Sequence, residues 1–505
     1  MHPVKKLPTT LPAVSKLPTV YPLPGSTIYT YDSLTAELHA LKNSYPDLIT
    51  LSSIGNSVEG RNLWSVSLGR GARRILIVGA CHAREWLTSA LLVKMIQTYA
   101  AADRSGSSLD GYPVRGVLDQ YTLLFVPMQN PDGVTLAQFG LSAFPEEKHA
   151  RLLAMKPDRS DNFTRWKANL NGVDLNRQHQ AGSGGWARYK DNVGGTPQKP
   201  WFENYPGTSP ETEPESRAIA SLIRQGNFDA VLTFHSSGNI FFWYYFQDRS
   251  SSTIMSRDRK IVQALSDYSG YGNYNPASVN WNAGAHLTAW VVHDLKIPCI
   301  TVEIGAFTTG YLKMSDLPGI WARTKAVPLV TAQALPGYRN CFVLQCRVAP
   351  PDGGKVTGAG SYPYAAAFKV RAVPEQHYAF VSWTENGRVI GNAPDLSIQL
   401  TADRTLTANF EPVEYEVAVS ISPEEGGSAA GAGLYRYGSG AVLTAVPAEG
   451  YAFDCWMEDD LPLDESAKYT FTVGDHRSLT ACFTKIPGEG DDEAAAAVKG
   501  VEGKR

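Results

Sequence analysis

Apolar runs of strand length alternate with amphipathic helical stretches through the first two thirds of the chain. One example is the run 75–78, which is followed by a stretch of helical periodicity over 86–99. Alternation of this kind is typical of an α/β domain. The pattern changes near Pro336, after which helix signals nearly vanish and Gly, Thr, Val and Tyr dominate. We therefore predict an α/β domain over 27–336, followed by an all-β region.

The all-β region is an internal repeat. Gly353 corresponds to Gly426 and Trp383 to Trp456, in both cases 73 residues later. The same offset aligns Tyr362 with Tyr435, Val373-Pro374 with Val446-Pro447, Tyr378-Ala379-Phe380 with Tyr451-Ala452-Phe453, and Phe410 with Phe483. Such agreement without gaps indicates two copies of one small domain, at 345–412 and 415–486. We expect each copy to form four or five short strands that are joined by glycine-rich turns and closed around one tryptophan.

The motif series of these copies resembles the divergent internalin-type B-repeats of bacterial surface proteins. The resemblance implies a small β-fold in an extracellular, wall-associated setting, and it implies no chemistry. A spacer or stalk and a module that contacts the cell wall or a carbohydrate both remain open as roles. Cys455 and Cys482 occur only in the second copy, where the first has Ser382 and Asn409, so a disulfide between them is possible.

Composition limits the partners and the location. The chain has 46 Lys plus Arg and 49 Asp plus Glu, and it contains no polybasic run, which excludes nucleic acid as a partner. No stretch is apolar for long enough to form a transmembrane segment. The N-terminal extension, 1–26, lacks the apolar core of a signal peptide, and we expect 487–505 to be a disordered tail.

Polar residues end three of the apolar runs in the α/β region. His82 ends the first run and is followed three residues later by Glu85, whereas His235 and Glu303 end two later runs. Ligands of open α/β sheets bind at the carboxyl ends of strands, so these side chains are expected to meet. Two histidines and one carboxylate leave a coordination position open for water, which is the pattern of a catalytic zinc site. A carboxylate in an apolar strand, such as that of Glu303, is costly unless it is paired or functional.

Six motifs follow one another along the same region. They are Ile54–Arg61, Gly79–Thr88, Asn130–Gly133, Trp166–Arg177, His235–Gly238 and Thr301–Gly305. In order and spacing they resemble the zinc carboxypeptidases of the M14 family over about 27–335. The resemblance implies an α/β fold with a mixed central sheet flanked by helices. It also implies hydrolysis of a peptide bond next to a free carboxylate, with one zinc ion bound by His82, Glu85 and His235.

The resemblance further implies roles for five side chains. Glu303 would be the general base, taking a proton from a zinc-activated water and returning it to the leaving amine. Asn176 and Arg177 would hold the terminal carboxylate of the substrate, because a guanidinium can donate two parallel hydrogen bonds to a carboxylate. Arg84 would be a further arginine that contacts the substrate. Lys167 occupies the position at which digestive members carry an arginine that stabilises the oxyanion. A lysine supplies the same positive charge but cannot donate two parallel hydrogen bonds.

One expected residue is missing. The family's substrate-capping tyrosine should precede the catalytic glutamate, yet the window 280–290 contains no tyrosine. Trp281, His286 or a displaced Tyr274 could take its place, and ordinary loop packing is an equally good interpretation of all three.

Several motifs resemble bacterial members that cut the bond between γ-D-glutamate and meso-diaminopimelate more than they resemble digestive enzymes. Thr288 lies near the position that selects the C-terminal side chain, and its lack of charge argues against a pocket for Lys or Arg. We therefore expect a peptide or muropeptide substrate with a free carboxylate, an extracellular or cell-surface location, and cell-wall contact through the repeats.

Two alternatives remain open: a general peptide carboxypeptidase of the same mechanism, and a non-catalytic surface adhesion protein with an inactive peptidase domain. The absence of Gly-x-Ser-x-Gly and His-Glu-x-x-His excludes serine hydrolases and thermolysin-like enzymes.

Overall fold

The computed structural model describes residues 27–192, 195–243, 252–274, 285–307, 311–339, 341–363 and 366–487. The chain divides into two compact units, Met1–Arg339 and Asn340–Arg505. The predicted extension 1–26 and nearly all of the predicted tail 487–505 lie outside the described residues. Among the helices of the described part, none is long and apolar enough to cross a membrane.

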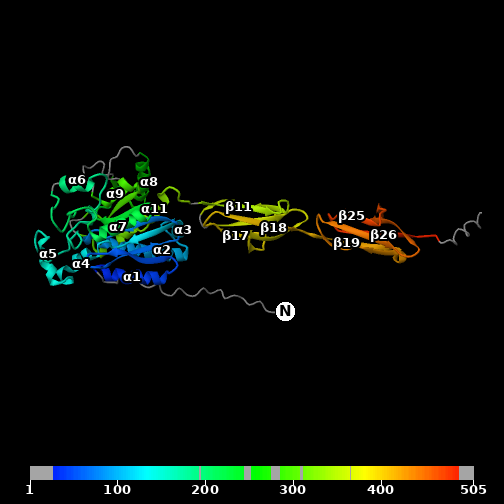
Figure 1. The fold of residues 1–505 in the computed structure, drawn as a ribbon, viewed down its shortest axis with the longest axis horizontal. Helices are drawn as coiled ribbons and strands as arrows, with labels where there is room; N and C mark the ends of the chain where they lie inside the picture. Colours follow the sequence, from blue (N-terminus) through cyan, green and yellow to red (C-terminus); the bar gives the residue numbers. More distant parts are fainter. Residues whose placement is uncertain are drawn as a thin grey trace, which may run out of the picture. The chain divides into compact units, whose positions relative to one another are not determined.

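An eight-stranded mixed sheet with the order β1-β2-β6-β3-β7-β10-β8-β9 forms the centre of the first unit (Figure 1). The strands are β1 (Ile49–Asn56), β2 (Asn62–Leu68), β3 (Arg73–Val78), β6 (Tyr121–Val126), β7 (Ala230–Ser236), β8 (Ile240–Trp243), β9 (Gly272–Tyr274) and β10 (Cys299–Ile304). The inner strands β6, β3, β7 and β10 are parallel, whereas β1 with β2, β2 with β6, and β8 with β10 are antiparallel. The predicted α/β fold with a mixed sheet is confirmed. A separate ribbon pairs β4 (Ser108–Leu109) with β5 (Tyr112–Pro113).

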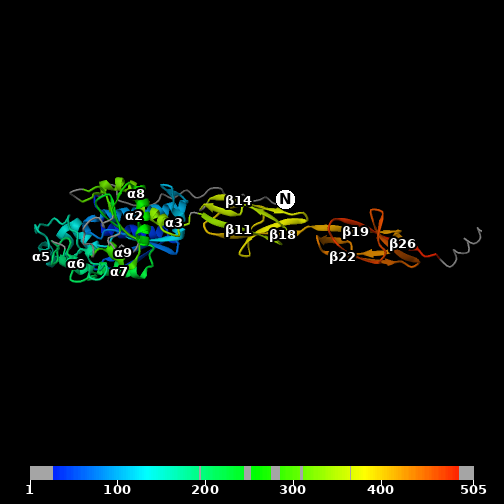
Figure 2. The ribbon, with the colours of Figure 1, turned by 90° about the horizontal axis from the view of Figure 1, so that it is seen from above.

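Helices surround this sheet (Figures 1 and 2). They are α1 (Tyr31–Ser44), α2 (Leu87–Ser105), α3 (Val114–Gln120), α4 (Pro131–Phe139), α5 (His149–Ala154), α6 (Gly185–Asn192), α7 (Pro214–Gln225), α8 (Ser252–Ser269), α9 (Leu287–Leu295), α10 (Leu317–Thr324) and α11 (Val327–Ala334). The four residues Ile75–Val78 of β3 are all buried, although successive side chains point to opposite faces. Both faces of the central strand are therefore covered, which is why its sequence is continuously apolar.

The second unit contains two copies of one β-fold. The first comprises β11 (Cys341–Ala349), β12 (Gly354–Thr357), β13 (Gly360–Pro363), β14 (Ala367–Pro374), β15 (Tyr378–Glu385), β16 (Arg388–Gly391), β17 (Asp395–Gln399) and β18 (Arg404–Pro412). The second comprises β19 (Glu414–Ser422), β20 (Gly427–Ala430), β21 (Gly433–Arg436), β22 (Gly440–Pro447), β23 (Tyr451–Glu458), β24 (Leu461–Asp464), β25 (Lys468–Thr472) and β26 (Arg477–Lys485). The five-stranded sheet β13-β11-β18-β15-β16 of the first copy corresponds strand for strand to β21-β19-β26-β23-β24 of the second.

The prediction of four or five strands in each repeat is wrong, because each copy has eight. Three of the eight are only four residues long, and strands such as Leu461–Asp464 bury none of their side chains. Such strands lack the alternation of buried and exposed positions that marks a strand in sequence. The longer β22 alternates clearly, and Trp383 and Trp456 lie at the centres of the two cores with no exposed surface.

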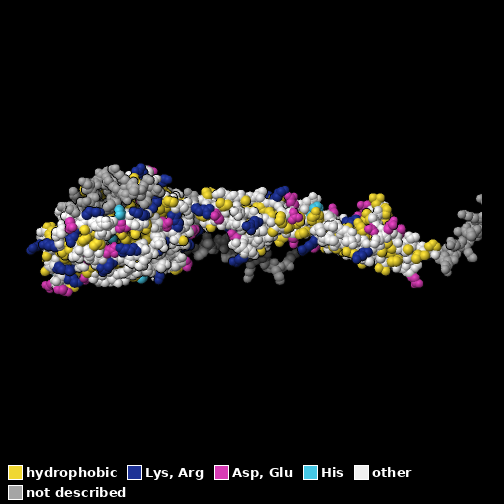
Figure 3. Space-filling view, turned by 45° about the horizontal axis from the view of Figure 1, so that its top comes forward, with side chains coloured by type: hydrophobic (Ala, Val, Ile, Leu, Met, Phe, Trp, Pro, Cys, Tyr) yellow, Lys and Arg dark blue, Asp and Glu magenta, His cyan; other side chains and the backbone are white. Residues whose placement is uncertain are grey.

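Charged side chains of both signs are interspersed over both units. On the face that Figure 3 shows, Lys and Arg alternate with Asp and Glu, and no large field of one sign is visible. This distribution agrees with the near balance of 46 basic and 49 acidic residues in the sequence.

Candidate metal centre and peptidase site

The turn after β3 carries two of the predicted metal ligands. The turn begins at Gly79. A side chain is not tolerated at this position, because a Cβ would lie only 2.8 Å from the carbonyl oxygen of Pro127. The backbone N–H of Ala80 donates to Oγ1 of Thr88 at 2.7 Å, and that hydroxyl donates to the carbonyl oxygen of Glu85 at 2.8 Å. These bonds fix the short 3-10 helix η1 (Ala83–Glu85), so that the side chains of His82, just before it, and Glu85, its last residue, face one point.

His82, Glu85 and His235 meet at this point. Nδ1 of His82 lies 2.8 Å from Oε1 of Glu85, and Nδ1 of His235 lies 3.0 Å from Oε2 of the same carboxylate. The two Nδ1 atoms are 3.2 Å apart. All three residues are buried, so no solvent screens the site. They come from the ends of the neighbouring parallel strands β3 and β7, as the sequence predicted.

The donor set fits a zinc ion. The Nδ1 atoms of His82 and His235 face each other at 3.2 Å, and both face the carboxylate of Glu85. The three side chains therefore surround one position that a cation can occupy. Metal–nitrogen bonds of about 2.0–2.1 Å in a tetrahedral site place two ligand atoms about 3.3 Å apart. Burial alone would raise the pKa of Glu85, but the charge of His82 and the hydrogen bond from His235 hold it well below its usual range. The carboxylate is therefore ionised and ready to bind a cation.

Glu303 lies beside the metal ligands on the adjacent strand. In the parallel pairing of β10 with β7, its Cα is opposite that of His235. Burial is the main cause that raises the pKa of Glu303 to about 7; the charge of His235 opposes this shift, and the charge of Glu85 adds to it. A carboxylate with a pKa near neutrality can both accept and return a proton, which is what a general base requires.

Asp174 links two of the predicted residues, and the sequence analysis missed it. Its Oδ1 lies 3.3 Å from Nε2 of His82, and its Oδ2 lies 3.1 Å from Nζ of Lys167. The carboxylate is fully buried, and the backbone N–H groups of Asn176 and Asn204 donate to it at 3.0 and 3.2 Å. A carboxylate on the outer nitrogen of a metal-binding histidine fixes the orientation of the ring. The signal was present, because Asp174 stands between Val173 and Leu175 as Glu303 stands between apolar neighbours.

The predicted substrate-binding residues gather near Asp174, except for one. Arg177 donates from Nε to the hydroxyl of Tyr189 at 2.9 Å and from Nη1 to the carbonyl oxygen of Asn176 at 3.0 Å. Oδ1 of Asn176 accepts from the N–H of Leu287 at 3.2 Å, which ties it to the start of α9. Arg84 instead lies 3.3 Å from Oε2 of Glu203, although its charge still lowers the pKa of Glu303.

The three alternatives for the capping residue lie in different places. Trp281 lies outside the described residues, and Tyr274 is 39% exposed at the end of β9. His286 is held between two bonded neighbours: Ala285 accepts from the N–H of His179, and Leu287 donates to Asn176. Burial lowers the pKa of His286, and the charge of Arg177 lowers it further. Of the three, His286 therefore has a described position close to the Asn176–Arg177 pair.

Comparison with known proteins identifies the families to which the two units are similar. The sequence profile of the zinc carboxypeptidase family matches residues 34–326, and that of the divergent InlB B-repeat domain matches 344–414 and 417–487. The first match spans more than half of the 505 residues, and the chain therefore belongs to the zinc carboxypeptidase family.

Individual relatives differ in how much of each chain they match. Gamma-D-glutamyl-L-diamino acid endopeptidase 1 of Lysinibacillus sphaericus is 32% identical over 284 residues, or 56% of this chain and 67% of that protein. Carboxypeptidase B of Astacus astacus is 27% identical over 220 residues, or 43% of this chain and 62% of that protein. The solved structure of bovine thrombin-activatable fibrinolysis inhibitor gives a TM-score of 0.47 at 18% identity, covering 61% of this chain and 96% of that one.

Proposed function

We propose that the protein hydrolyses bacterial cell-wall peptides at the bond between a γ-D-glutamyl residue and diaminopimelate, outside the cell or at its surface. The observation that carries the hydrolytic activity is the meeting of His82, Glu85 and His235, with Glu303 opposite His235 on the next strand. The substrate class is supported by the similarity to an endopeptidase named for γ-D-glutamyl-L-diamino acid bonds.

In this proposal the metal is held by His82, Glu85 and His235. When bound, zinc polarises the scissile carbonyl and makes water a nucleophile at neutral pH. Glu303 accepts a proton from the attacking water on its carboxylate and delivers that proton to the nitrogen of the leaving amine.

Lys167 and the residues around it act on the substrate. The ammonium of Lys167 stabilises the negative charge that develops on the carbonyl oxygen, because it is 8% exposed and poorly screened by water. Asp174 fixes the positions of His82 and Lys167, because each of its two carboxylate oxygens contacts one of them. Asn176 and Arg177 bind the carboxylate on the leaving side, and Arg84 contacts the substrate farther from the metal.

The repeats serve the same setting in this proposal. Their similarity to divergent InlB B-repeats supports a surface-associated protein whose C-terminal unit separates the peptidase from the wall or holds it there. Of these two roles, contact with the wall suits the proposed substrate better, because that substrate is part of the peptidoglycan.

The test is to incubate zinc-loaded protein with a muropeptide stem that contains the γ-D-Glu–diaminopimelate bond and, separately, with N-blocked L-dipeptides. Products are identified by mass spectrometry, with Glu303→Gln as the inactive control. We expect release of the diaminopimelate-containing fragment. Cleavage of the L-dipeptides alone would reject the cell-wall substrate in favour of a general carboxypeptidase. Cleavage of neither, with zinc bound, would favour the adhesion protein.

A further inference from the structure

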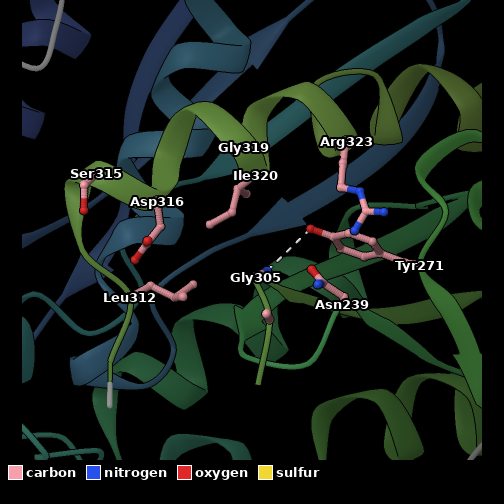
Figure 4. Close-up of a pocket in the computed structure, with 10 residues that line it drawn as sticks. Asn239, Tyr271, Gly305, Leu312, Ser315, Asp316, Gly319, Ile320 and Arg323 are labelled. Atoms are coloured by element: carbon pink, nitrogen blue, oxygen red, sulfur yellow. Dashed lines mark hydrogen bonds between the residues drawn. The ribbon is translucent and has the colours of Figure 1, made fainter. Parts of the chain in front are cut away.

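A pocket of about 470 Å³ opens beyond the end of β10, the strand that carries Glu303 (Figure 4). Its walls include Asn239, Tyr271, Gly305, Leu312, Asp316 and Arg323. Gly305 follows Glu303 by two residues, and Asn239 follows His235 by four. The N–H groups of Gly238 and Asn239 donate to the carbonyl oxygen of Gly305 at 2.8 and 2.9 Å. The pocket is therefore built on the same strand ends that carry the candidate base and one metal ligand.

One face of α10 and the residue before it forms a wall of this pocket. Asp316, Gly319, Ile320 and Arg323 all line it, and their spacing of three, four and seven residues places them on one helix face. Oδ2 of Asp316 already accepts the N–H of Lys313 at 2.7 Å. The acidic end of the face is thus engaged in capping the short 3-10 helix Met314–Asp316 that precedes α10.

Arg323 provides the basic end. Its guanidinium lies 5.5 Å from the centre of the Tyr271 ring, and the buried Tyr271 is fixed in turn by its hydroxyl, which accepts from the N–H of Gly305 at 3.4 Å. Among the residues that the structure describes, no carboxylate forms an ion pair with Arg323. The N–H edge of this guanidinium is therefore available, and that edge matches a carboxylate.

The pocket has room for a ligand between its two charged ends. A Cβ added at Gly319 would meet no atom within 4 Å, so the space over the middle of the helix face is open. In Figure 4 the side chains of Arg323, Tyr271 and Leu312 border this space.

We propose that this pocket binds the part of the substrate on the acyl side of the scissile bond, and that Arg323 selects acyl groups that carry a carboxylate. The proposal rests on the function proposed above. Asn176 and Arg177, which hold the leaving side, contact α6 and the start of α9, and neither lines the pocket. A γ-linked glutamyl residue keeps its α-carboxyl group free, because its peptide bond is made through the side chain. Such a substrate therefore presents an anion on the acyl side.

Two substrates that differ in one group test the role of Arg323. They share the leaving residue and the γ-glutamyl bond, and the α-carboxyl group of the glutamyl residue is either free or a carboxamide. We expect the wild-type protein to favour the free carboxylate by about tenfold in kcat/KM, the effect of one charge-assisted hydrogen-bond pair at an accessible site. Arg323→Gln should abolish this preference by slowing cleavage of the substrate with the free carboxylate. Arg259→Gln, at an exposed arginine of α8 that does not line the pocket, is the matched control.

Filling the pocket gives an independent test. Gly319→Leu should fold, because the added side chain meets open space and leucine favours a helix more than glycine does. It should slow cleavage of substrates with a long acyl part while sparing those with a short one, and Gly319→Ala should behave as the wild type. An unchanged carboxylate preference in Arg323→Gln, or an equal effect of Gly319→Leu on short and long substrates, would overturn the proposal.

The design separates this proposal from the proposed function. If the wild-type protein cleaves L-peptides and spares γ-glutamyl bonds, the substrate class fails. The pocket is then tested with L-peptides that carry Glu or Gln on the acyl side. A Glu preference that disappears in Arg323→Gln supports the pocket, and the absence of any preference contradicts it.

Discussion

Glu303 is the residue whose chemistry is easiest to separate from metal binding, because it is not one of the three converging ligands. Glu303→Gln keeps the shape and removes the proton-accepting oxygen. We expect kcat to fall by about two to four orders of magnitude, the usual contribution of a general base, while one zinc remains bound per chain. The checks are a measurement of kcat and a determination of the zinc content of the same protein sample. Substantial surviving turnover would remove Glu303 from the mechanism.

Glu37 affects stability rather than catalysis. It is buried in α1, where the hydroxyl of Tyr29 donates to its Oε2 at 2.9 Å. Burial raises its pKa from 4.5 to about 7, against the opposing hydrogen bond. The folded state thus holds the proton more tightly than the unfolded chain, so this contribution to stability is complete below about pH 4.5 and is lost as the pH rises toward 7. The loss amounts to at most about 3 kcal/mol.

The variant Glu37→Gln cannot ionise and should remove this dependence. Its Tm for the first unit should exceed that of the wild type by a few degrees at pH 8 and by much less at pH 5, as measured by calorimetry at both values. Equal changes at the two pH values would mean that Glu37 is not protonated in the folded protein at pH 5.

At the scale of single residues, the pattern of apolar runs pointed to the side chains that end strands and did not point to Asp174. His82, His235 and Glu303 could be found because an apolar run stops at a polar residue, and the order of parallel strands then brings such ends together. Asp174 lies in an irregular loop, and its contacts with His82 and Lys167 depend on how that loop packs over the sheet. The position of Glu303 opposite His235 depends on the register between β10 and β7, which the periodicity of the sequence does not specify.

At the scale of elements, the two repeats have different side chains at one equivalent pair of facing strand positions. In β15 and β18, Nδ2 of Asn409 donates to the carbonyl oxygen of Ser382 at 3.1 Å. The equivalent residues of β23 and β26 are Cys455 and Cys482, which are directly opposite in the ladder and are both thiols in this structure. Burial raises the pKa of Cys455, and the neighbouring Asp454 and Cys482 raise it further.

We predict that these two thiols form a disulfide in an oxidising environment. Closing the loop between β23 and β26 should stabilise the second repeat by about 3 kcal/mol relative to its reduced form. Peptide mapping under non-reducing conditions checks the link. Cys341 and Cys346, which lie on the single strand β11, are the internal control and should remain unlinked to each other. Two free thiols at Cys455 and Cys482 after oxidation would contradict the prediction.

At the scale of the whole molecule, catalysis and the repeats belong to separate units. Every candidate site residue lies before Arg339, and the cores of the two units share no residue. The sequence could predict this division because the change near Pro336 alters both the periodicity and the glycine content. Strand number within each repeat was beyond reach, since short strands such as β24 bury no side chain.

The separation makes the role of the repeats testable by truncation. A chain that ends at Arg339 should retain the kcat/KM of the full chain on soluble peptides, because it keeps the whole site and its own core. On insoluble peptidoglycan, contact through the repeats would raise the effective concentration of the peptidase at its substrate, so truncation should slow product release by about tenfold or more. Both rates are measured by quantifying released peptides, with sedimentation of an Asn340–Pro487 fragment on the same peptidoglycan as control. Equal rates on the insoluble substrate, with the fragment left in solution, would show that the repeats act as a spacer and do not bind the wall.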